Sequence, residues 1–332
     1  MVSSKIEHIA LVSASSAVPY RADKRCMIEN SEMDDLKSGL TYDTAKLGLV
    51  TIGDIDLRYR DADGGGKHYH GRGHFEEYVS PMYRLLADEL KPSHCIDIGA
   101  NYGYTGLLMR RAFPDANLTL VEPIPWLESF VRKNFENNGA SFDRFISAIA
   151  SDAAATTEFG VNTNASQDSR VKAQGNWDVI STTSVTLSEI TSPVSADQGV
   201  YIKIDTQGWE ESVFRGGERF LSSHNRWFIK TEFAPHWMIS QGSDPVAVLE
   251  SWLEKYDIYE SLGRVAWNCS SLTDMIGKKL EPGDGAKFVD YVQTLNKNGL
   301  GWVDLFVLPP ASRRAYANTV ERPSSIWKRL FD

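Results

Sequence analysis

Short apolar runs alternate with amphipathic stretches from residue 94 to residue 310, and few folds are compatible with this order. The runs have the length of buried strands, and the stretches between them space their apolar residues as helices do. Strands that alternate with helices form crossover units, which build a mostly parallel sheet covered by helices on both faces. The sequence therefore predicts an α/β fold with a Rossmann-like sheet. The predicted strands span residues 94–100, 117–123, 143–151, 200–205, 226–233, 257–263 and 302–310.

The segments outside this alternating region divide the chain into three parts. Residues 1–75 are expected to form an N-terminal extension, residues 76–310 the catalytic domain and residues 311–332 a peripheral tail. The extension contains LGLVTIGDIDLRYRD, which predicts a β-hairpin that turns at Gly53 and Asp54. The stretch GGGKHYHGRGHF that follows is rich in glycine and histidine, so we expect a loop there.

Composition limits the partners and the compartment. The formal net charge of −9 argues against a nucleic-acid groove, because phosphate binding needs clustered Lys and Arg, but it does not exclude a small anionic ligand. Cys26, Cys95 and Cys269 stand far apart without a CxxC pair, which is typical of a reducing compartment. The N-terminus is a poor signal peptide, and no apolar run approaches the length of a membrane span. We therefore expect a cytoplasmic protein without a transmembrane segment.

The first strand-to-helix turn carries a glycine loop that begins with an acid. IDIGANYGYTG places Asp97, Gly99, Asn101 and Gly103 in the pattern D-x-G-x-N-x-G. A dinucleotide-binding fold would have G-x-G-x-x-G here, so that a pyrophosphate meets the helix N-terminus. A carboxylate before the first glycine would repel a pyrophosphate and attract an ammonium group, while the glycines let the backbone approach a ligand closely. The loop therefore indicates a ligand with an amino-acid part.

The next predicted strand ends in Glu122, about 20 residues after the glycine loop, and Pro123 follows it. An acidic residue at this place binds the two hydroxyls of a ribose in nucleotide-binding sheets. S-adenosylmethionine combines an amino-acid part with a ribose and has no phosphate bridge, so it fits both features. The alternative is an ordinary turn with a solvated glutamate, which the glycine loop and Glu122 together disfavour.

Several motifs, taken in order, resemble the FkbM-type S-adenosylmethionine-dependent methyltransferases: IDIGANYGYTG, VEP, NFENNG, AIASD and IKIDTQGWE, with Gly216. The resemblance covers residues 76–232, and it implies a Rossmann-like methyltransferase sheet and O-methylation, often of sugars or polyketide-type natural products. It places Asp205 in the active site. The usual family form D-x-E-G-x-E differs here at Gln207, whereas Glu210 is kept. The cofactor residues that we take from the resemblance are Asp97, Gly99, Asn101, Gly103 and Glu122. Pro123 and Ala148 are further candidates for the cofactor site.

Two predicted strands end in the same arrangement of a lysine and a carboxylate. Residues two apart in a strand point to the same face, so Lys203 and Asp205 share a face. Asp205 ends its strand at the edge where open α/β sheets bind ligands. FIKTEF repeats the pattern with Lys230 and Glu232, and the usual methyltransferase topology makes the two strands neighbours. We therefore expect two carboxylates at the mouth of the site, each with a lysine one layer below.

The chemistry of methyl transfer to a hydroxyl gives these carboxylates a role. A sulfonium is already a good leaving group, but an alcohol is protonated at neutral pH. Asp205 or Glu232 could act as a general base, or both could be ligands of Mg²⁺, which lowers the pKa of the hydroxyl. The lysines would keep both carboxylates ionised. The alternative is a structural ion pair at each strand end.

Two polar segments supply further candidates. His68, His70 and His74 lie in the glycine-rich stretch, where a loop over the cofactor is favoured over a metal site. His74 could approach the acceptor hydroxyl as a base. The segment NTNASQDSR, residues 162–170, lies between strands, and its polar side chains fit hydrogen bonding to a hydroxylated acceptor. A solvated loop is the alternative for this segment.

Together these observations predict an S-adenosylmethionine-dependent O-methyltransferase that acts on a saccharide or other small-molecule acceptor. The catalytic candidates are Asp205, Glu232 and His74, and the first two would be the ligands if the enzyme uses Mg²⁺. The saccharide follows from the resemblance alone. A nucleotide-sugar or NAD enzyme on a similar sheet is disfavoured by the missing G-x-G-x-x-G. A methyltransferase-like scaffold or partner subunit is disfavoured by the intact Asp97, Glu122 and Asp205. The sequence carries no signal for the oligomeric state.

Overall fold

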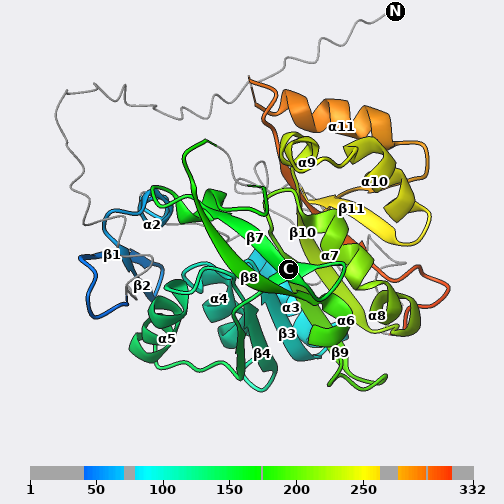
Figure 1. The fold of residues 1–332 in the computed structure, drawn as a ribbon. Helices are drawn as coiled ribbons and strands as arrows, with labels where there is room; N and C mark the ends of the chain where they lie inside the picture. The colour runs from blue at the N-terminus through cyan, green and yellow to red at the C-terminus, as the bar shows by residue number, and fades with distance from the viewer. Residues whose placement is uncertain (1–40, 71–78, 173–174, 262–275, 297, 316–332) are drawn as a thin grey trace, which may run out of the picture. The chain divides into compact units, whose positions relative to one another are not determined.

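An eight-stranded sheet runs through the part of the chain that the computed structural model describes (Figure 1). The described residues are 41–70, 79–172, 175–261, 276–296 and 298–315. In spatial order the strands are β12 (Ile276–Leu280), β11 (Asp257–Ser261), β13 (Val303–Leu308), β10 (Trp227–Phe233), β9 (Gly199–Ile204), β3 (Pro92–Ile98), β4 (Asn117–Val121) and β5 (Arg144–Ile146). The four pairings from β10 to β5 are parallel, and the three from β12 to β10 are antiparallel. The predicted α/β sheet is therefore confirmed as a mixed sheet.

Helices cover the sheet on both faces. Successive side chains along a strand point to opposite faces, so neighbouring residues of one strand contact different helices. Ile202 in β9 belongs to the apolar cluster that includes Leu187 of α6 (Leu187–Ile190) and residues of α7 (Glu210–Gly216) and α8 (Glu218–Ser223). Its neighbour Tyr201 points to the opposite face and meets Tyr83 of α3 (Val79–Glu89), beside α4 (Tyr104–Ala112). All six residues of β9 are buried as a result.

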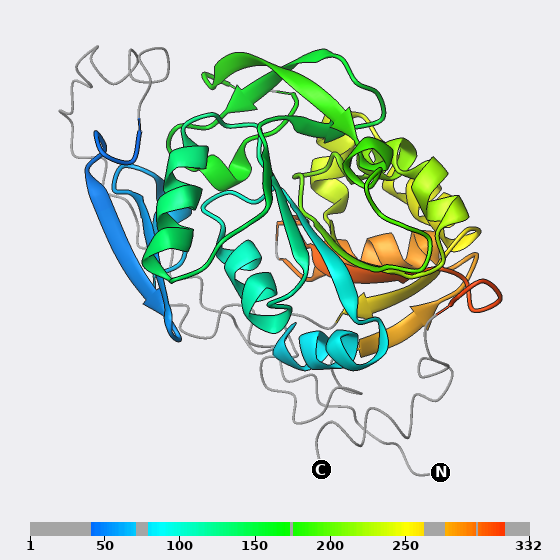
Figure 2. The same cartoon turned by 90° about the horizontal axis from the view of Figure 1, so that it is seen from below.

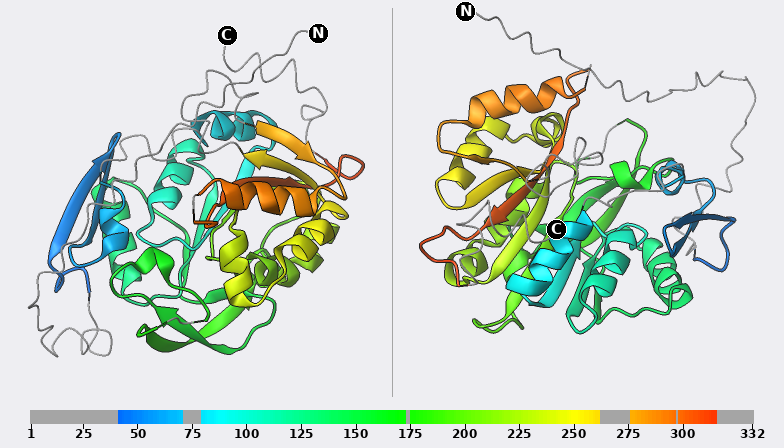
Figure 3. Two further views of the ribbon diagram at one scale, coloured as in Figure 1. Left: turned by 90° about the horizontal axis from the view of Figure 1, so that it is seen from above. Right: turned by 180° about the vertical axis from the view of Figure 1, so that it is seen from behind.

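Three helices group at the end of the sheet that contains β11 and β13 (Figure 3). They are α9 (Pro235–Gln241), α10 (Pro245–Leu253) and α11 (Gly285–Thr294). Asp244 caps α10, because its side chain accepts hydrogen bonds from the backbone of Val246 and Ala247, and Pro245 occupies the first turn. In the described ranges, no helix has both the length and the apolar character that a membrane span requires.

A hairpin of β1 (Leu47–Ile52) and β2 (Ile55–Arg60) lies beside α5 (Leu127–Asn137) (Figure 2). Gly53 has a φ of 61° in its turn, a left-handed value that favours glycine. The Asn134 side chain of α5 pairs with the backbone of Arg58, accepting from its N–H at 2.9 Å and donating to its carbonyl at 3.0 Å. The loop expected at residues 64–75 is wrong for residues 64–67, which form the short helix α2 (Gly64–Lys67) with Asp63 as its cap through Gly65 N–H. Residues 71–75 of this stretch lie outside the described residues.

A second, three-stranded sheet is inserted between β5 and α6. Its order is β6 (Ile149–Ser151), β8 (Asp178–Thr186) and β7 (Thr156–Val161), and the 3₁₀ turn η1 (Ser166–Asp168) lies between β7 and β8. The single strand predicted for residues 143–151 is therefore wrong. The chain turns where Ala148 N–H donates to the Ile146 carbonyl, so β5 and β6 join different sheets.

Candidate active site

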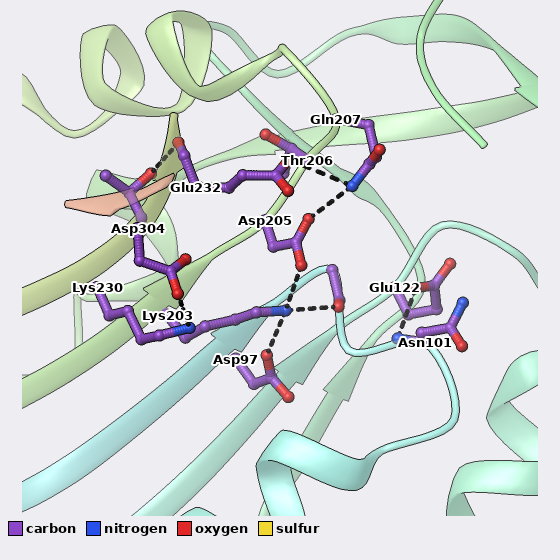
Figure 4. Close-up of polar contacts among 12 residues, drawn as sticks. Asp97, Asn101, Glu122, Lys203, Asp205, Thr206, Gln207, Lys230, Glu232 and Asp304 are labelled. Carbon is purple, nitrogen blue, oxygen red and sulfur yellow. Dashed lines mark hydrogen bonds and ion pairs between the residues drawn. The ribbon is translucent and has the colours of Figure 1, made fainter. Parts of the chain in front are cut away.

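Parallel register brings the polar candidates to one edge of the sheet. Val121, Ile98, Ile204 and Thr231 form one row of aligned residues across β4, β3, β9 and β10. The residues after Val121, Ile98 and Ile204 follow the ends of their strands, and the residue after Thr231 is the last but one in β10. These four residues are Glu122, Gly99, Asp205 and Glu232, and Figure 4 shows the three acids and the glycine loop at this edge. Side chains that are more than 100 residues apart in sequence thus form one site.

The glycine loop packs directly against the end of β9. Gly99 has a φ of 80°, and a Cβ at this position would collide with the carbonyl oxygen of Asp205. Asp205 N–H donates to the Ile98 carbonyl at 3.1 Å and holds the two turns together. Asn101 and Gly103 also have left-handed φ values, of 47° and 86°. Glycine is needed at Gly99 because the backbones meet there.

Glu122 is a buried acid whose carboxylate organises the loop. Glu122 is 4% exposed. Its two carboxylate oxygens accept hydrogen bonds from Asn101 N–H and Ile124 N–H, each at 2.9 Å. Burial raises the pKa of Glu122 to about 7, although the two backbone hydrogen bonds act in the opposite direction. The other candidate cofactor residues of this side, Pro123 and Ala148, are buried next to Glu122 and after β5.

Asp97 lies behind the loop instead of at its open side. It is 0% exposed, and its carboxylate faces Lys203, whose Nζ is 3.4 Å from Oδ1. Burial raises the pKa of Asp97, and the charge of Lys203 opposes that rise. Asp97 therefore balances the charge of Lys203 beneath the glycine loop. Because its carboxylate is not exposed, Asp97 could attract an ammonium group of a ligand only across the loop and not by direct contact.

Lys203 connects the loop with the end of β9, as Figure 4 shows. Its Nζ donates to the Gly99 carbonyl at 3.0 Å and lies 3.5 Å from Asp205 Oδ2. Lys203 and Asp205 thus share a face, as the period of two predicts. The side chain of Asp205 is 38% exposed, whereas that of Lys203 is 7% exposed. Asp205 is therefore the part of this buried charge network that a second molecule can reach.

Gln207 joins the two strand-end carboxylates. Its Nε2 donates to Asp205 Oδ1 at 2.9 Å and to Glu232 Oε2 at 3.3 Å. Gln207 has a φ of 54°, which directs its side chain back over the turn. Glu210 fixes this turn, because its Oε1 accepts from Thr206 N–H and Thr206 Oγ1, each at 2.9 Å. The departure from the family motif at Gln207 therefore lies between the two candidate catalytic acids.

Glu232 has a different electrostatic environment from Asp205. Burial raises its pKa well above the usual range, and the charges of Asp205, Glu210 and Asp304 add to this effect. Within the described ranges Lys230 forms no ion pair with Glu232, and its Nζ lies 3.0 Å from Asp304 of β13 instead. The prediction that a lysine keeps each carboxylate ionised is wrong for Glu232. The cause is that β13 pairs with β10 and competes for Lys230.

The metal alternative lacks a suitable group of ligands in the described part of the chain. Among those residues, no group of three or more His, Cys, Asp and Glu is arranged to hold a metal ion. Gln207 presents an amide N–H, not an oxygen, to both carboxylates. Mg²⁺ prefers an octahedron of oxygens, so this arrangement does not fit it.

The segment between β7 and β8 packs onto the site. Asn101 Nδ2 donates to Ser166 Oγ at 3.0 Å, and Asp63 Oδ1 accepts from Ser166 N–H at 2.9 Å. Tyr102 OH donates to Asp63 Oδ2 at 2.6 Å, which completes a buried connection to the hairpin side. The solvated-loop alternative is thus wrong for the buried residues Ser166 and Arg170. Asp63 was missed in the sequence, where a cap before three glycines is its only signal.

The histidine candidates do not meet the carboxylates in the described structure. His70 Nε2 forms a hydrogen bond with Tyr59 OH in β2, and the His68 ring contacts Tyr69. His74 lies outside the described residues, so its proposed role as a base stays a prediction. Of these two histidines, His70 thus contacts the hairpin.

Comparison with known proteins identifies the domain. Residues 97–257 match the model of the methyltransferase FkbM domain. The solved structure of a methyltransferase FkbM from Methylobacillus flagellatus KT is 14% identical with a TM-score of 0.36, and the match covers 65% of this chain and 43% of that one. The O-methyltransferase TomG from Streptomyces achromogenes, solved with SAM, is 11% identical with a TM-score of 0.31, covering 69% and 78%. No curated protein matches the chain. Residues 97–257 thus belong to the FkbM methyltransferase family.

Proposed function

We propose that the chain is an S-adenosylmethionine-dependent O-methyltransferase in which Asp205 is the general base for an acceptor hydroxyl. The observation that carries this proposal is the position of Asp205 in an FkbM domain. It ends β9 beside the glycine loop, its side chain is 38% exposed, and Lys203 and Gln207 hold it from two sides. A carboxylate that is fixed and reachable is what a hydroxyl nucleophile needs.

The residues of the candidate cofactor site fit S-adenosylmethionine. Each oxygen of Glu122 accepts one backbone N–H and has capacity for another donor, such as a ribose hydroxyl. Asn101 Oδ1 is a buried acceptor that has no hydrogen-bond partner among the described residues, and a ligand amino group could donate to it. The bound cofactor would supply a methyl group on a sulfonium, which is a good leaving group. Glu122, Asn101 and the backbone of the glycine loop would orient it.

The charges around Asp205 support a division of roles between the two acids. Lys203 Nζ lies 3.5 Å from Asp205 Oδ2, and the carboxylate held there would accept the hydroxyl proton. Burial and the charges of Asp205, Glu210 and Asp304 raise the pKa of Glu232, so this carboxyl group holds a proton more readily than an ordinary glutamate does. Gln207 donates to both carboxylates and fixes their relative orientation. We therefore favour the plain base over a pair of Mg²⁺ ligands.

The acceptor class follows from the family resemblance and not from the geometry. We propose a saccharide hydroxyl on a glycan, glycolipid or glycosylated natural product. The direct test is an acceptor screen with S-adenosylmethionine carrying an isotopic label in its methyl group, combined with native mass spectrometry of the protein with S-adenosylhomocysteine. Label in the acceptor would support the proposal. Binding without transfer to any acceptor would favour the scaffold alternative, and comparable binding of NADH would favour a dehydrogenase.

A further inference from the structure

Arg170 is a buried cation in the segment that packs onto the site. Its residue is 2% exposed, and its guanidinium carbon lies 3.6 Å from the ring centre of Trp237 and 4.9 Å from that of Trp177. The backbone of Arg170 pairs with that of Gly160 at the end of β7, which fixes the residue in place. The guanidinium is thus held between two aromatic side chains by a rigid backbone.

The charge of Arg170 is poorly balanced within the described structure. Nε donates to the Asp168 carbonyl at 3.0 Å, but Nη1 is buried without a hydrogen-bond partner. No carboxylate among the described residues forms an ion pair with it. Contacts with aromatic faces offset part of the cost of burying a guanidinium, but they do not replace hydrogen bonds at its nitrogens. Burial lowers the pKa of Arg170, and the charges of Asp168 and Glu232 oppose this shift.

Two contacts place Arg170 next to the strand-end carboxylates. Trp237 lies in α9, which begins directly after β10 and Glu232. A Cβ at Gly208 would collide with the Trp237 backbone, so this tryptophan also adjoins the turn of Asp205 and Gln207. The same segment reaches the glycine loop through Ser166 and Asn101. Arg170 therefore lies close to the turn of Asp205 and Gln207, where an acceptor hydroxyl would have to bind.

We infer that Arg170 binds an anionic group of the acceptor, a carboxylate or a phosphate, so that the acceptor is an acidic saccharide or a phosphorylated one. This inference rests on the proposed function and adds the substrate class. A planar guanidinium forms strong charge-assisted hydrogen bonds with such groups, often through two nitrogens. The acidic composition is no obstacle, because a single buried cation is enough for a small anion.

Binding of simple sugars to the protein saturated with S-adenosylhomocysteine tests this inference without a known acceptor. Glucuronate, glucose 6-phosphate and glucose are titrated while the indole N–H signals are followed by NMR, because Trp177 and Trp237 contact Arg170. We expect one or both anionic sugars to bind at least about tenfold more tightly than glucose. Glucuronate and glucose 6-phosphate also distinguish a carboxylate from a phosphate. Equal binding of all three sugars to the wild-type protein would overturn the inference.

Two variants separate a binding role from a packing role. Arg170→Gln removes the charge and should abolish the preference for anionic sugars. Arg215→Gln is the matched control, because Arg215 is an exposed arginine that pairs with Asp152 at 2.7 Å on the surface, and it should keep the preference. Persistence of the preference in a folded Arg170→Gln protein would show that Arg170 only packs. Affinity for S-adenosylhomocysteine, measured separately, tests the proposed function and should be unchanged in both variants.

Discussion

Binding of S-adenosylhomocysteine is expected to tighten as pH rises, because Glu122 titrates near neutrality. Burial raises the pKa of Glu122 to about 7 in the free protein. Ribose hydroxyls would donate to its ionised form, so the bound state has a lower pKa and binding expels the proton. The affinity for S-adenosylhomocysteine should therefore decrease as the pH is lowered below the pKa of Glu122 in the free protein. Above that pKa the affinity should be independent of pH. The ionised fraction changes from about 0.9 near pH 8 to about 0.1 near pH 6, which weakens binding about tenfold, or about 1.4 kcal/mol.

Calorimetric titration measures both the affinity and the proton release. Titrations near pH 6 in two buffers with different ionisation heats should show release of nearly one proton, and titrations near pH 8 should show little. Glu122→Gln keeps the shape and removes the titration, so its affinity should be weaker near pH 8, by about 1–3 kcal/mol, and independent of pH. A flat wild-type profile, or a pH dependence that survives in Glu122→Gln, would refute the assignment of Glu122 to the cofactor.

Three other perturbations probe the charge network. Lys203→Met leaves Asp97 buried without its cation and should lower the free energy of unfolding by about 3–5 kcal/mol in urea; a change near zero would contradict this. The pKa of Glu210 rises from 4.5 to about 7 on burial, so wild-type stability should fall by about 3 kcal/mol as pH rises through that window, and Glu210→Gln should lose this decline in thermal melts. EDTA should leave turnover unchanged, because Gln207 places an amide N–H between the carboxylates; loss restored by Mg²⁺ would identify a metal enzyme.

Local periodicity accounts for the part of the site that the sequence predicts well. Alternation along β9 places Lys203 and Asp205 on one face, and their 3.5 Å separation agrees with it. The glycine loop and Glu122 follow adjacent parallel strands, so their meeting through Asn101 N–H depends only on the order of crossover units. Features that depend only on one strand and the turn after it can therefore be predicted from the sequence.

Features that depend on contacts between elements far apart in the sequence could not be predicted. Lys230 pairs with Asp304, because β13 inserts antiparallel beside β10, and nothing near Lys230 in the sequence indicates this neighbour. Arg170 stands in a polar run that resembles a solvated loop, but its guanidinium packs against Trp237 of α9, which lies more than 60 residues further along the chain. No sequence motif indicates the left-handed backbone of Gln207. Its hydrogen bonds to both Asp205 and Glu232 could therefore not be predicted from the sequence.

The claim that Asp205 activates the acceptor hydroxyl is tested most directly by single-turnover methyl transfer in Asp205→Asn. The variant keeps the size of the side chain and removes the charge that Lys203 and Gln207 orient. Mixing with labelled S-adenosylmethionine and an acceptor from the screen should show a rate about 10²-fold or more below wild type. Affinity for S-adenosylhomocysteine and the thermal melt should be nearly unchanged. A wild-type rate, or a loss of rate that is matched by unfolding of the variant, would show that Asp205 is a structural ion-pair partner and not the base.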